Sequence, residues 1–256
     1  MIVRKSMAEL EKMRAAGLLV YQILDRMRQM VQVGVSTFEL EATAEKMMAD
    51  AGARSAFKGY GGPNHATKFP TVLCVSVNEE IVHGMPSQKK ILKDGDIVSI
   101  DTGVQLNGYY GDSAVTVGVG TISDESQKLM NVTREALELA IEKARPGNRL
   151  FDICGTVERH VTANGFSIVR EFVGHGIGTQ MHEEPQIPNY IDRRGENPRL
   201  KEGMVLAIEP MVNAGKPGSR VRSDQWTAVT EDGKYSAHFE HTVAITANGP
   251  WVLTRP

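Results

Sequence analysis

The chain has little cysteine and almost no unbalanced charge, and both shortages exclude classes of protein. Its 256 residues include two cysteines, Cys74 and Cys154, which are too few for a disulfide framework or a cysteine-rich zinc site. We expect both to be buried as small apolar residues in a reducing compartment. The formal net charge of −2 offers no basic field, so we expect no specific nucleic-acid binding.

The chain also lacks a long hydrophobic run. The apolar stretch at residues 15–24 is short and is interrupted by Gln22, and residues 1–14 mix both signs of charge. Neither stretch is typical of a signal peptide or a membrane span. We therefore expect a cytoplasmic protein without a membrane segment.

Helices are predicted where apolar residues recur with a period of about 3.6. The first follows Ser6, which forms a capping-box pattern with Glu9, and continues to residue 31. The others are expected from Ser36 or Thr37 to about residue 51, from Ser123 or Asp124 to Pro146, and over residues 150–164.

Strand-like runs occur between and after these helices. Residues 71–77, 167–173 and 204–212 are rich in β-branched and other apolar residues. Residues 226–230 and 238–246 are predicted to form a final antiparallel pair that turns near Asp232-Gly233.

The strongest local signal is Asn107-Gly108, between strand-like runs at residues 96–105 and 109–117. Asn-Gly is typical of a two-residue hairpin turn, because both turn residues must accept positive φ. With these two residues in the turn, Gly103 faces Asp112 across the hairpin.

Asp101 then shares a face with Asp112 as its diagonal neighbour, with Cα atoms about 7–8 Å apart. Two carboxylates so placed can bind a pair of metal ions from both sides. The alternative is that both are solvated, as most hairpin carboxylates are. Their apolar flanks instead place them in strand interiors that look buried, where an ionised group needs a partner or a metal.

A second copy of the pattern supports the metal-binding interpretation. Residues 93–101 and 201–209 share a lysine, an acid, a glycine, an isoleucine and a terminal acid. Asp101 and Glu209 are the terminal acids, and Glu240 is the plausible counterpart of Asp112.

The repeat predicts an α+β fold of two pseudo-symmetric halves, approximately residues 1–120 and 121–256. Each half would run helix, helix, strand, then antiparallel strands. The halves are expected to close one central antiparallel sheet with helices on its outer face. The length suits one large domain or two small ones, and a shared sheet favours one.

Four acids would therefore converge, and the glycine-rich residues 174–178 add one imidazole: Asp101, Asp112, Glu209, Glu240 and His175. Four oxygen ligands and one nitrogen suit two divalent first-row ions better than a structural zinc, which prefers four Cys or His ligands. The sequence contains no H-E-x-x-H zinc-protease motif and no all-oxygen calcium loop.

The order and spacing of these residues resemble the type I methionine aminopeptidases, which have the pita-bread fold. The resemblance covers nearly the whole chain and is most specific at residues 78–84, 100–103, 111–112, 174–178, 182–185, 208–210 and 239–242. It implies a single catalytic domain, residues 1–256, that removes the initiator methionine of nascent proteins when the next residue is small. It also implies a compact bacterial-type monomer that acts near the ribosome.

The resemblance assigns a role to each ligand. Asp101 would bind one ion and Asp112 both, while His175 and Glu209 would complete the second ion's shell and Glu240 would bridge. This mixed set accepts Co, Mn, Fe, Zn or Ni.

The resemblance also implies catalytic roles. Glu209 would accept a proton from the attacking water, which two cations make acidic, and pass it to the leaving amine. His182 would stabilise the scissile carbonyl and its oxyanion, and His83 would lie near the leaving nitrogen. The remaining histidines are expected to be satisfied core or loop residues: His65, His160, His238 and His241.

A small apolar pocket for the methionine side chain is implied at Phe57, Tyr60, Phe69 and Trp226. Aromatic walls suit a thioether, because sulfur–ring contacts add about 0.3–1.5 kcal/mol. The chain departs from shorter relatives by extra residues within 61–68 and by Met181, where many have an aromatic. The resemblance further implies a monovalent cation near Asn78, Glu80 and Ser236, bound through mainly backbone oxygens.

Two other functions are compatible with the same residues. A proline-directed peptidase of the prolidase kind would share the ligands, although such proteins usually carry an additional N-terminal domain. A non-catalytic peptide- or ribosome-binding protein could reuse the fold, but such a protein is expected to have lost ligands.

Overall fold

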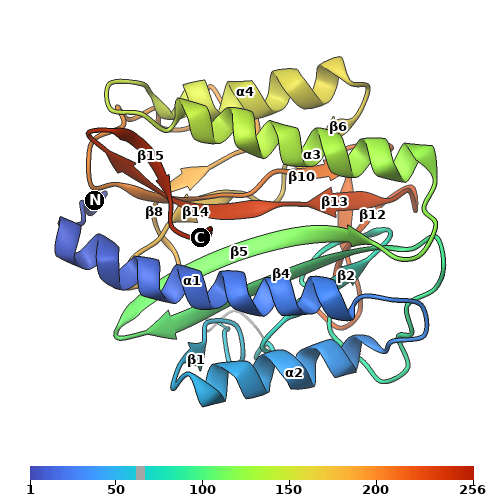
Figure 1. Ribbon diagram of the computed structural model, residues 1–256. Helices are drawn as coiled ribbons and strands as arrows, with labels where there is room; N and C mark the ends of the chain where they lie inside the picture. Colours follow the sequence, from blue (N-terminus) through green and yellow to red (C-terminus); the bar gives the residue numbers. More distant parts are fainter. Residues whose placement is uncertain (62–66) are drawn as a thin grey trace.

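A central antiparallel sheet organises the protein in a computed structural model that describes residues 1–61 and 67–256. The long hairpin lies near its middle (Figure 1). The strands follow the order β1 (Arg54–Ser55), β4 (Ile97–Leu106), β5 (Tyr109–Gly118), β14 (Glu240–Thr246), β9 (Val205–Ile208), β7 (Gly174–Gly176) and β8 (Glu183–Ile187), with β2 (Cys74–Val77) beside β4 and β15 (Gly249–Val252) beside β14.

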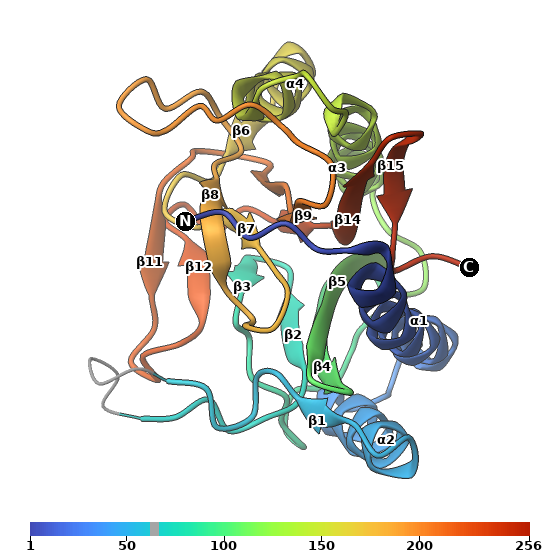
Figure 2. The ribbon, with the colours of Figure 1, turned by 90° about the vertical axis from the view of Figure 1, so that its left-hand side faces the viewer.

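Shorter strands form two additional groups among the described residues. One group has the order β11 (Ser219–Val221), β12 (Ala228–Thr230) and β3 (Glu80–Val82), and the other has the order β13 (Ser236–His238), β10 (Met211–Asn213) and β6 (Ser167–Ile168). In the view of Figure 2, β3, β11 and β12 lie on the side of the sheet away from α1.

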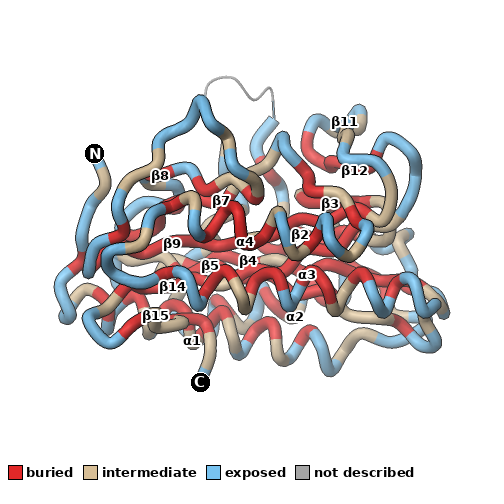
Figure 3. The backbone as a smooth tube through the Cα atoms, turned by 90° about the horizontal axis from the view of Figure 1, so that it is seen from above, coloured by how far each residue is buried: buried red, intermediate tan, exposed pale blue. Residues whose placement is uncertain are grey.

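The helices cover the other face of the sheet: α1 (Met7–Met30), α2 (Thr37–Asp50), α3 (Asp124–Lys143) and α4 (Leu150–Ala163). Helix α1 lies along β4 and β5, and α3 packs on α4 and contacts β10 and β13. The buried backbone in Figure 3 follows the strands and the inner faces of these helices. The predicted antiparallel sheet with helices on its outer face is thereby confirmed. No helix within residues 1–61 and 67–256 is long and apolar enough to cross a membrane.

The helix starts agree with their capping signals. At α1 the backbone N–H of Ser6 donates to Glu9 Oε2 at 2.7 Å, which is the predicted capping box. Ser36 rather than Thr37 caps α2, and Ser123 rather than Asp124 caps α3, where its Oγ accepts from Ser126 N at 3.1 Å. The Ser36 and Ser123 side chains each satisfy a helical N–H that has no partner inside the helix.

The hairpin has the predicted register. Leu106 pairs with Tyr109 across Asn107 and Gly108, whose φ values are 52° and 84°. Gly103 therefore faces Asp112, as expected.

The predicted pairing of residues 226–230 with 238–246 is wrong. Strand β12 pairs with β3 and β11, whereas β14 pairs with β5, β9 and β15. After residue 233 the chain first forms β13, which pairs with β10. Alternation indicates that a segment is a strand, but it does not specify a partner that lies far away in sequence.

Three predicted strands are shorter in the structure. Residues 71–77 form a strand only from Cys74, and residues 167–173 only through Ile168. The run 204–212 is divided into β9 and β10 at Glu209-Pro210. Proline has no N–H for a ladder hydrogen bond and restricts the residue before it, so the break falls at the acid.

Substituting Gly17 tests the close approach of α1 to the C-terminal tail. A Cβ at this position would lie 2.3 Å from the carbonyl oxygen of Leu253. Although alanine favours a helix by about 1 kcal/mol, we expect Gly17→Ala to lower the free energy of unfolding by about 1–3 kcal/mol through overpacking. Urea unfolding measures the change. The exposed Ala15→Val in the same helix should cost less than about 1 kcal/mol, and an unchanged Gly17→Ala midpoint would contradict the packing argument.

Candidate metal centre and active site

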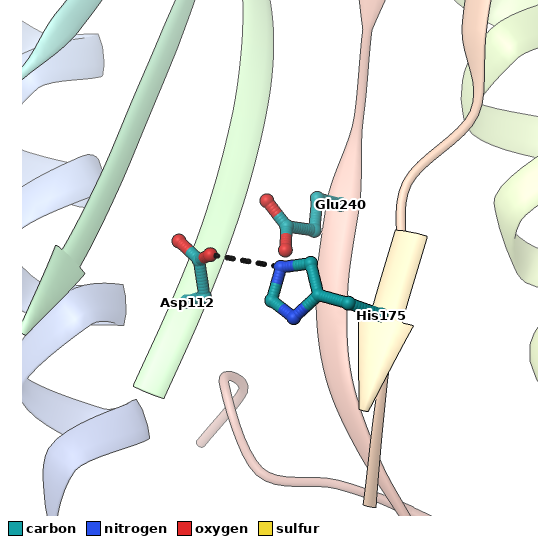
Figure 4. A group of neighbouring side chains, drawn as sticks. All are labelled: Asp112, His175 and Glu240. Carbon is teal, nitrogen blue, oxygen red and sulfur yellow. Dashed lines mark ion pairs between the residues drawn. The ribbon is translucent and has the colours of Figure 1, made fainter. Parts of the chain in front are cut away.

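Asp112, His175 and Glu240 bring three potential ligand atoms within 4.8 Å of one another. They come from β5, β7 and β14, and their side chains point toward a common centre (Figure 4). All three are buried, with exposures of 3%, 8% and 2%. Segments far apart in sequence therefore build one polar cluster in the middle of the sheet.

Asp101 and Glu209 join the same cluster. In the sheet, Ala114 of β5 pairs with Asp101 on one side and with Glu240 on the other, so these acids occupy one row. Glu209 follows β9, and its Oε1 lies 3.6 Å from Nε2 of His175. The structure thus brings all five predicted ligands to the wall of one cavity of about 400 Å³.

Burial raises the pKa of the clustered carboxyls, and their mutual repulsion adds to the effect. The pKa of Asp101, Glu209 and Glu240 is well above its ordinary value, because burial disfavours the charged form and neighbouring carboxylates repel it. Burial likewise raises the pKa of Asp112 to about 7.

The polar atoms of this cluster fit a cation. Among the described residues, Asp101 Oδ1, Asp112 Oδ1 and Glu240 Oε1 are buried without a hydrogen-bond partner. The 3.8 Å between His175 Nε2 and Asp112 Oδ2 is too long for a hydrogen bond. It is instead a reasonable separation for two ligands that each lie about 2.0–2.2 Å from a shared ion. Divalent cations would satisfy these oxygens and offset their repulsion.

His175 is prepared to offer a nitrogen lone pair. Its Nδ1 lies 2.9 Å from the carbonyl oxygen of Gly176, so Nδ1–H donates there and Nε2 faces the acids unprotonated. Burial, with a smaller contribution from His182, lowers the pKa of His175 to about 3 and keeps the imidazole neutral. The flanking glycines are required, since a Cβ at Gly174 would lie 2.4 Å from Ala207 O.

His182 lines the cavity; part of the residue is exposed to solvent, and the rest is covered by the cavity wall. Its ring is 4.3 Å from the ring of His175, and its Nδ1 is 2.9 Å from the hydroxyl of Tyr60. Desolvation lowers the pKa of His182. A neutral ring whose Nδ1 accepts from Tyr60 carries its proton on Nε2.

His83 lines the same cavity; it follows β3 and has a φ of 59°. Its ring contacts Phe172 and Trp226, at centroid distances of 5.5 and 6.4 Å. The preceding segment is fixed by Glu80, whose buried carboxylate accepts from Lys90 at 2.8 Å and from Arg222 at 2.5 Å.

The four aromatic residues expected at the pocket, Phe57, Tyr60, Phe69 and Trp226, all line this cavity. Phe69 packs edge-on against Phe57 and Trp226, with centroids 6.4 and 5.2 Å apart, and both Cys74 and Met181 also line the cavity. Tyr60 closes the rim with 43% of its surface exposed. The predicted extra residues lie mostly outside the described part of the chain, which omits 62–66.

Sequence reasoning missed several cavity residues. Cys74 is buried as expected, but it lines the site because it pairs with Asp101. The expectation that His238 is a satisfied core residue is wrong: it lines the cavity, and its Nε2 has no hydrogen-bond partner among the described residues. Strand alternation, which places His238 and Glu240 on one face, was the available signal. His160 and His241 form ordinary pairs with Glu135 and Thr254, and His65 lies outside the described residues.

The antiparallel sheet, with buried acids and an imidazole on one cavity wall, defines a hydrolase of the metal-dependent class. A family model described as metallopeptidase family M24 matches residues 11–247. The chain belongs to this family.

Individual relatives agree over the full length. Methionine aminopeptidase of Clostridium perfringens is 50% identical over 99% of both chains, and methionine aminopeptidase 1 of Bacillus subtilis is 50% identical over 100% of both. The crystal structure of methionine aminopeptidase from Thermotoga maritima covers 100% of both chains with a TM-score of 0.94 and 44% identity. The prolidase of Pyrococcus furiosus superposes with a TM-score of 0.77 and 25% identity, but this chain covers 66% of it. The pita-bread fold is thereby confirmed.

Metal removal is expected to make stability depend on pH. Below about pH 4 these carboxyls are protonated in both the folded and unfolded states. As the pH rises toward the folded pKa, about 7 for Asp112, the unfolded state loses its protons first. The free energy of unfolding of the metal-free protein therefore falls as the pH rises.

Added Mn²⁺ should accordingly raise the melting temperature more at pH 8 than at pH 5, because bound ligands must be deprotonated. Differential scanning calorimetry with and without the ion measures both shifts. Asp112→Asn should reduce the difference, and equal shifts at the two pH values would contradict the electrostatic account.

Proposed function

We propose that the chain is a metal-dependent aminopeptidase that removes the N-terminal methionine of nascent proteins when the next residue is small. The observation that carries this proposal is the convergence of five donors on one cavity wall: Asp101, Asp112, His175, Glu209 and Glu240. Relatives that are 50% identical over their full length and named methionine aminopeptidases support the same activity.

The site holds two divalent ions in this proposal. Asp101 would hold one ion, His175 and Glu209 would hold the other, and Asp112 and Glu240 would serve both. When bound, such a pair supplies Lewis acidity and lowers the pKa of a water molecule. The donor set accepts Co, Mn, Fe, Zn or Ni.

Glu209 serves as the proton carrier. Its carboxylate lines the cavity and accepts a proton from water, which it returns to the leaving amine. Asn189 Nδ2 donates to the Glu209 carbonyl oxygen at 3.0 Å, and Pro210 follows directly, so the backbone at this acid is fixed.

His182 and His83 orient the peptide. The Nε2–H of His182 donates to the scissile carbonyl and stabilises the developing oxyanion, while Tyr60 holds the other ring nitrogen. His83, which lines the same cavity, lies near the leaving nitrogen. A bulky second residue would crowd the space between these imidazoles, which explains the preference for small ones.

The methionine side chain occupies the aromatic part of the cavity. Phe57, Phe69 and Trp226 offer ring edges and faces to a thioether, and Tyr60 closes the entrance. An unbranched side chain reaches the bottom of such a pocket more readily than a branched one.

In this proposal, residues 1–256 work as one catalytic domain of two similar halves, as a monomer in the cytoplasm near ribosomes. A monovalent cation binds close to Asn78, Glu80 and Ser236. The Ser236 N–H donates to the Asn78 carbonyl at 2.8 Å, which supports the closeness of these two segments.

A proline-directed peptidase is the second candidate, since the prolidase of Pyrococcus furiosus shares the fold. The methionine aminopeptidases of Clostridium perfringens and Bacillus subtilis match this chain over their full length, which favours the first function. Cleavage of Met-Ala-Ser but not of Xaa-Pro peptides, lost with chelator and regained with added metal, is the expected result. The opposite preference would reverse the assignment.

Replacing the proton carrier tests the mechanism. Glu209→Gln preserves size but cannot accept the proton, so kcat should fall by at least about 100-fold, with an unchanged circular dichroism spectrum. Glu202→Gln, at a neighbouring exposed acid, is the control and should retain activity. Wild-type turnover by Glu209→Gln would defeat the assigned role.

Removing one hydroxyl tests how His182 is held. Tyr60→Phe keeps the aromatic wall but loses the hydrogen bond to Nδ1, so kcat should fall up to about tenfold, with a smaller change in KM. Steady-state kinetics measures both constants. Tyr21→Phe in α1 is the matched control, and an unchanged kcat for Tyr60→Phe would remove the hydrogen bond from the mechanism.

A further inference from the structure

His238 occupies an unusual place at the end of β13. Its neighbours Ala237 and Phe239 belong to the apolar core. Strand alternation turns the imidazole to the opposite face, where it lines the active-site cavity with only 2% of its surface exposed.

The backbone of His238 is held tightly. Its N–H donates to Thr116 Oγ1 at 2.9 Å, and the Thr116 hydroxyl donates to its carbonyl oxygen at 2.8 Å. His238 also pairs with Met211 of the neighbouring strand β10. These contacts fix the point from which the side chain enters the cavity.

The imidazole itself is unsatisfied on one side. Within residues 1–61 and 67–256, Nε2 is buried without a hydrogen-bond partner. Leaving a buried polar atom without a partner lowers the stability of the folded protein. Such an atom requires an explanation, and the nearby acid supplies one: Oε2 of Glu209 lies 3.9 Å from this nitrogen.

Glu209 therefore lies between two imidazoles, one beside each carboxylate oxygen. His175 Nε2 is 3.6 Å from Oε1, and His238 Nε2 is 3.9 Å from Oε2. The two rings differ in their protonation. The Nδ1–H of His175 donates to a carbonyl, leaving Nε2 as a lone pair, whereas no acceptor for Nδ1 of His238 is found in the described part of the chain. A proton on Nε2 of His238 instead has the carboxylate oxygen Oε2 of Glu209 only 3.9 Å away.

We propose, given the function above, that His238 is a positioning residue that donates a hydrogen bond from Nε2–H to Oε2 of Glu209. A side-chain movement of about 1 Å brings His238 Nε2 and Glu209 Oε2 to hydrogen-bond distance. Catalytic hydrogen bonds commonly shorten when substrate binds. The bond fixes the plane of the carboxylate. It leaves Oε1 directed toward His175 and the other acids, and holds Glu209 in the orientation for proton transfer.

Two substitutions separate this role from simple packing. His238→Leu removes the donor and retains bulk, so kcat should fall about tenfold, which corresponds to about 1.4 kcal/mol, with KM little changed. His238→Gln restores an N–H donor and should return kcat close to wild type. His160→Leu on α4, which removes the 3.2 Å contact with Glu135 of α3, is the control and should leave kcat unchanged. A fully active His238→Leu, or a folded His238→Gln as impaired as it, would overturn the proposal.

Two further measurements do not depend on turnover. In protein labelled with ¹⁵N-histidine and loaded with Zn²⁺, the His238 ring should show its proton on Nε2. The metal content of His238→Leu, measured by mass spectrometry, should equal that of the wild type. A proton on Nδ1, or the loss of bound ion, would refute hydrogen-bond donation. If the wild type failed to cleave Met-Ala-Ser, the proposed function would fail, while the tautomer would still decide the hydrogen bond.

Discussion

The repulsion among buried carboxylates is the constraint on which the rest of the structure depends. Two like charges about 4 Å apart near a protein surface repel by roughly 4 kcal/mol, and this cluster contains Asp101, Asp112, Glu209 and Glu240 around one neutral imidazole. The apolar core between the sheet and its helices holds these groups in place. The stability that this apolar core contributes therefore offsets the repulsion within the acidic cavity, which can then bind cations.

The residues of the centre were predictable because local signals determined their positions. Asn107-Gly108 fixes the hairpin register by turn chemistry alone, so the common face of Asp101 and Asp112 follows from counting. The repeated pattern that ends at Glu209 extends this argument to the second half. Helix caps at Ser6 and Ser36 are equally local, and both are present in the structure.

The errors arose where long-range pairing decides the outcome. Nothing within residues 226–230 indicates that β12 pairs with β3 rather than with β14. Likewise, a histidine in an apolar run resembles a core residue until the neighbouring strands show what faces it. His238 became interpretable only once its distance to Glu209 was known. The place of Glu209 at the end of a strand was predictable, but Pro210 separates β9 from β10 in a way that the uninterrupted apolar pattern conceals.

The central row that runs from Asp101 through Ala114 to Glu240 has a consequence for biosynthesis. Its last member belongs to β14, which enters the sheet between two strands made earlier, β5 and β9. During translation the sheet therefore has a gap until the C-terminal residues leave the ribosome. The cluster is incomplete until then, so cation binding cannot assist the earlier folding steps. Assembly of the sheet is therefore completed by the C-terminal residues, and a chain that stops before β14 lacks both the strand between β5 and β9 and Glu240.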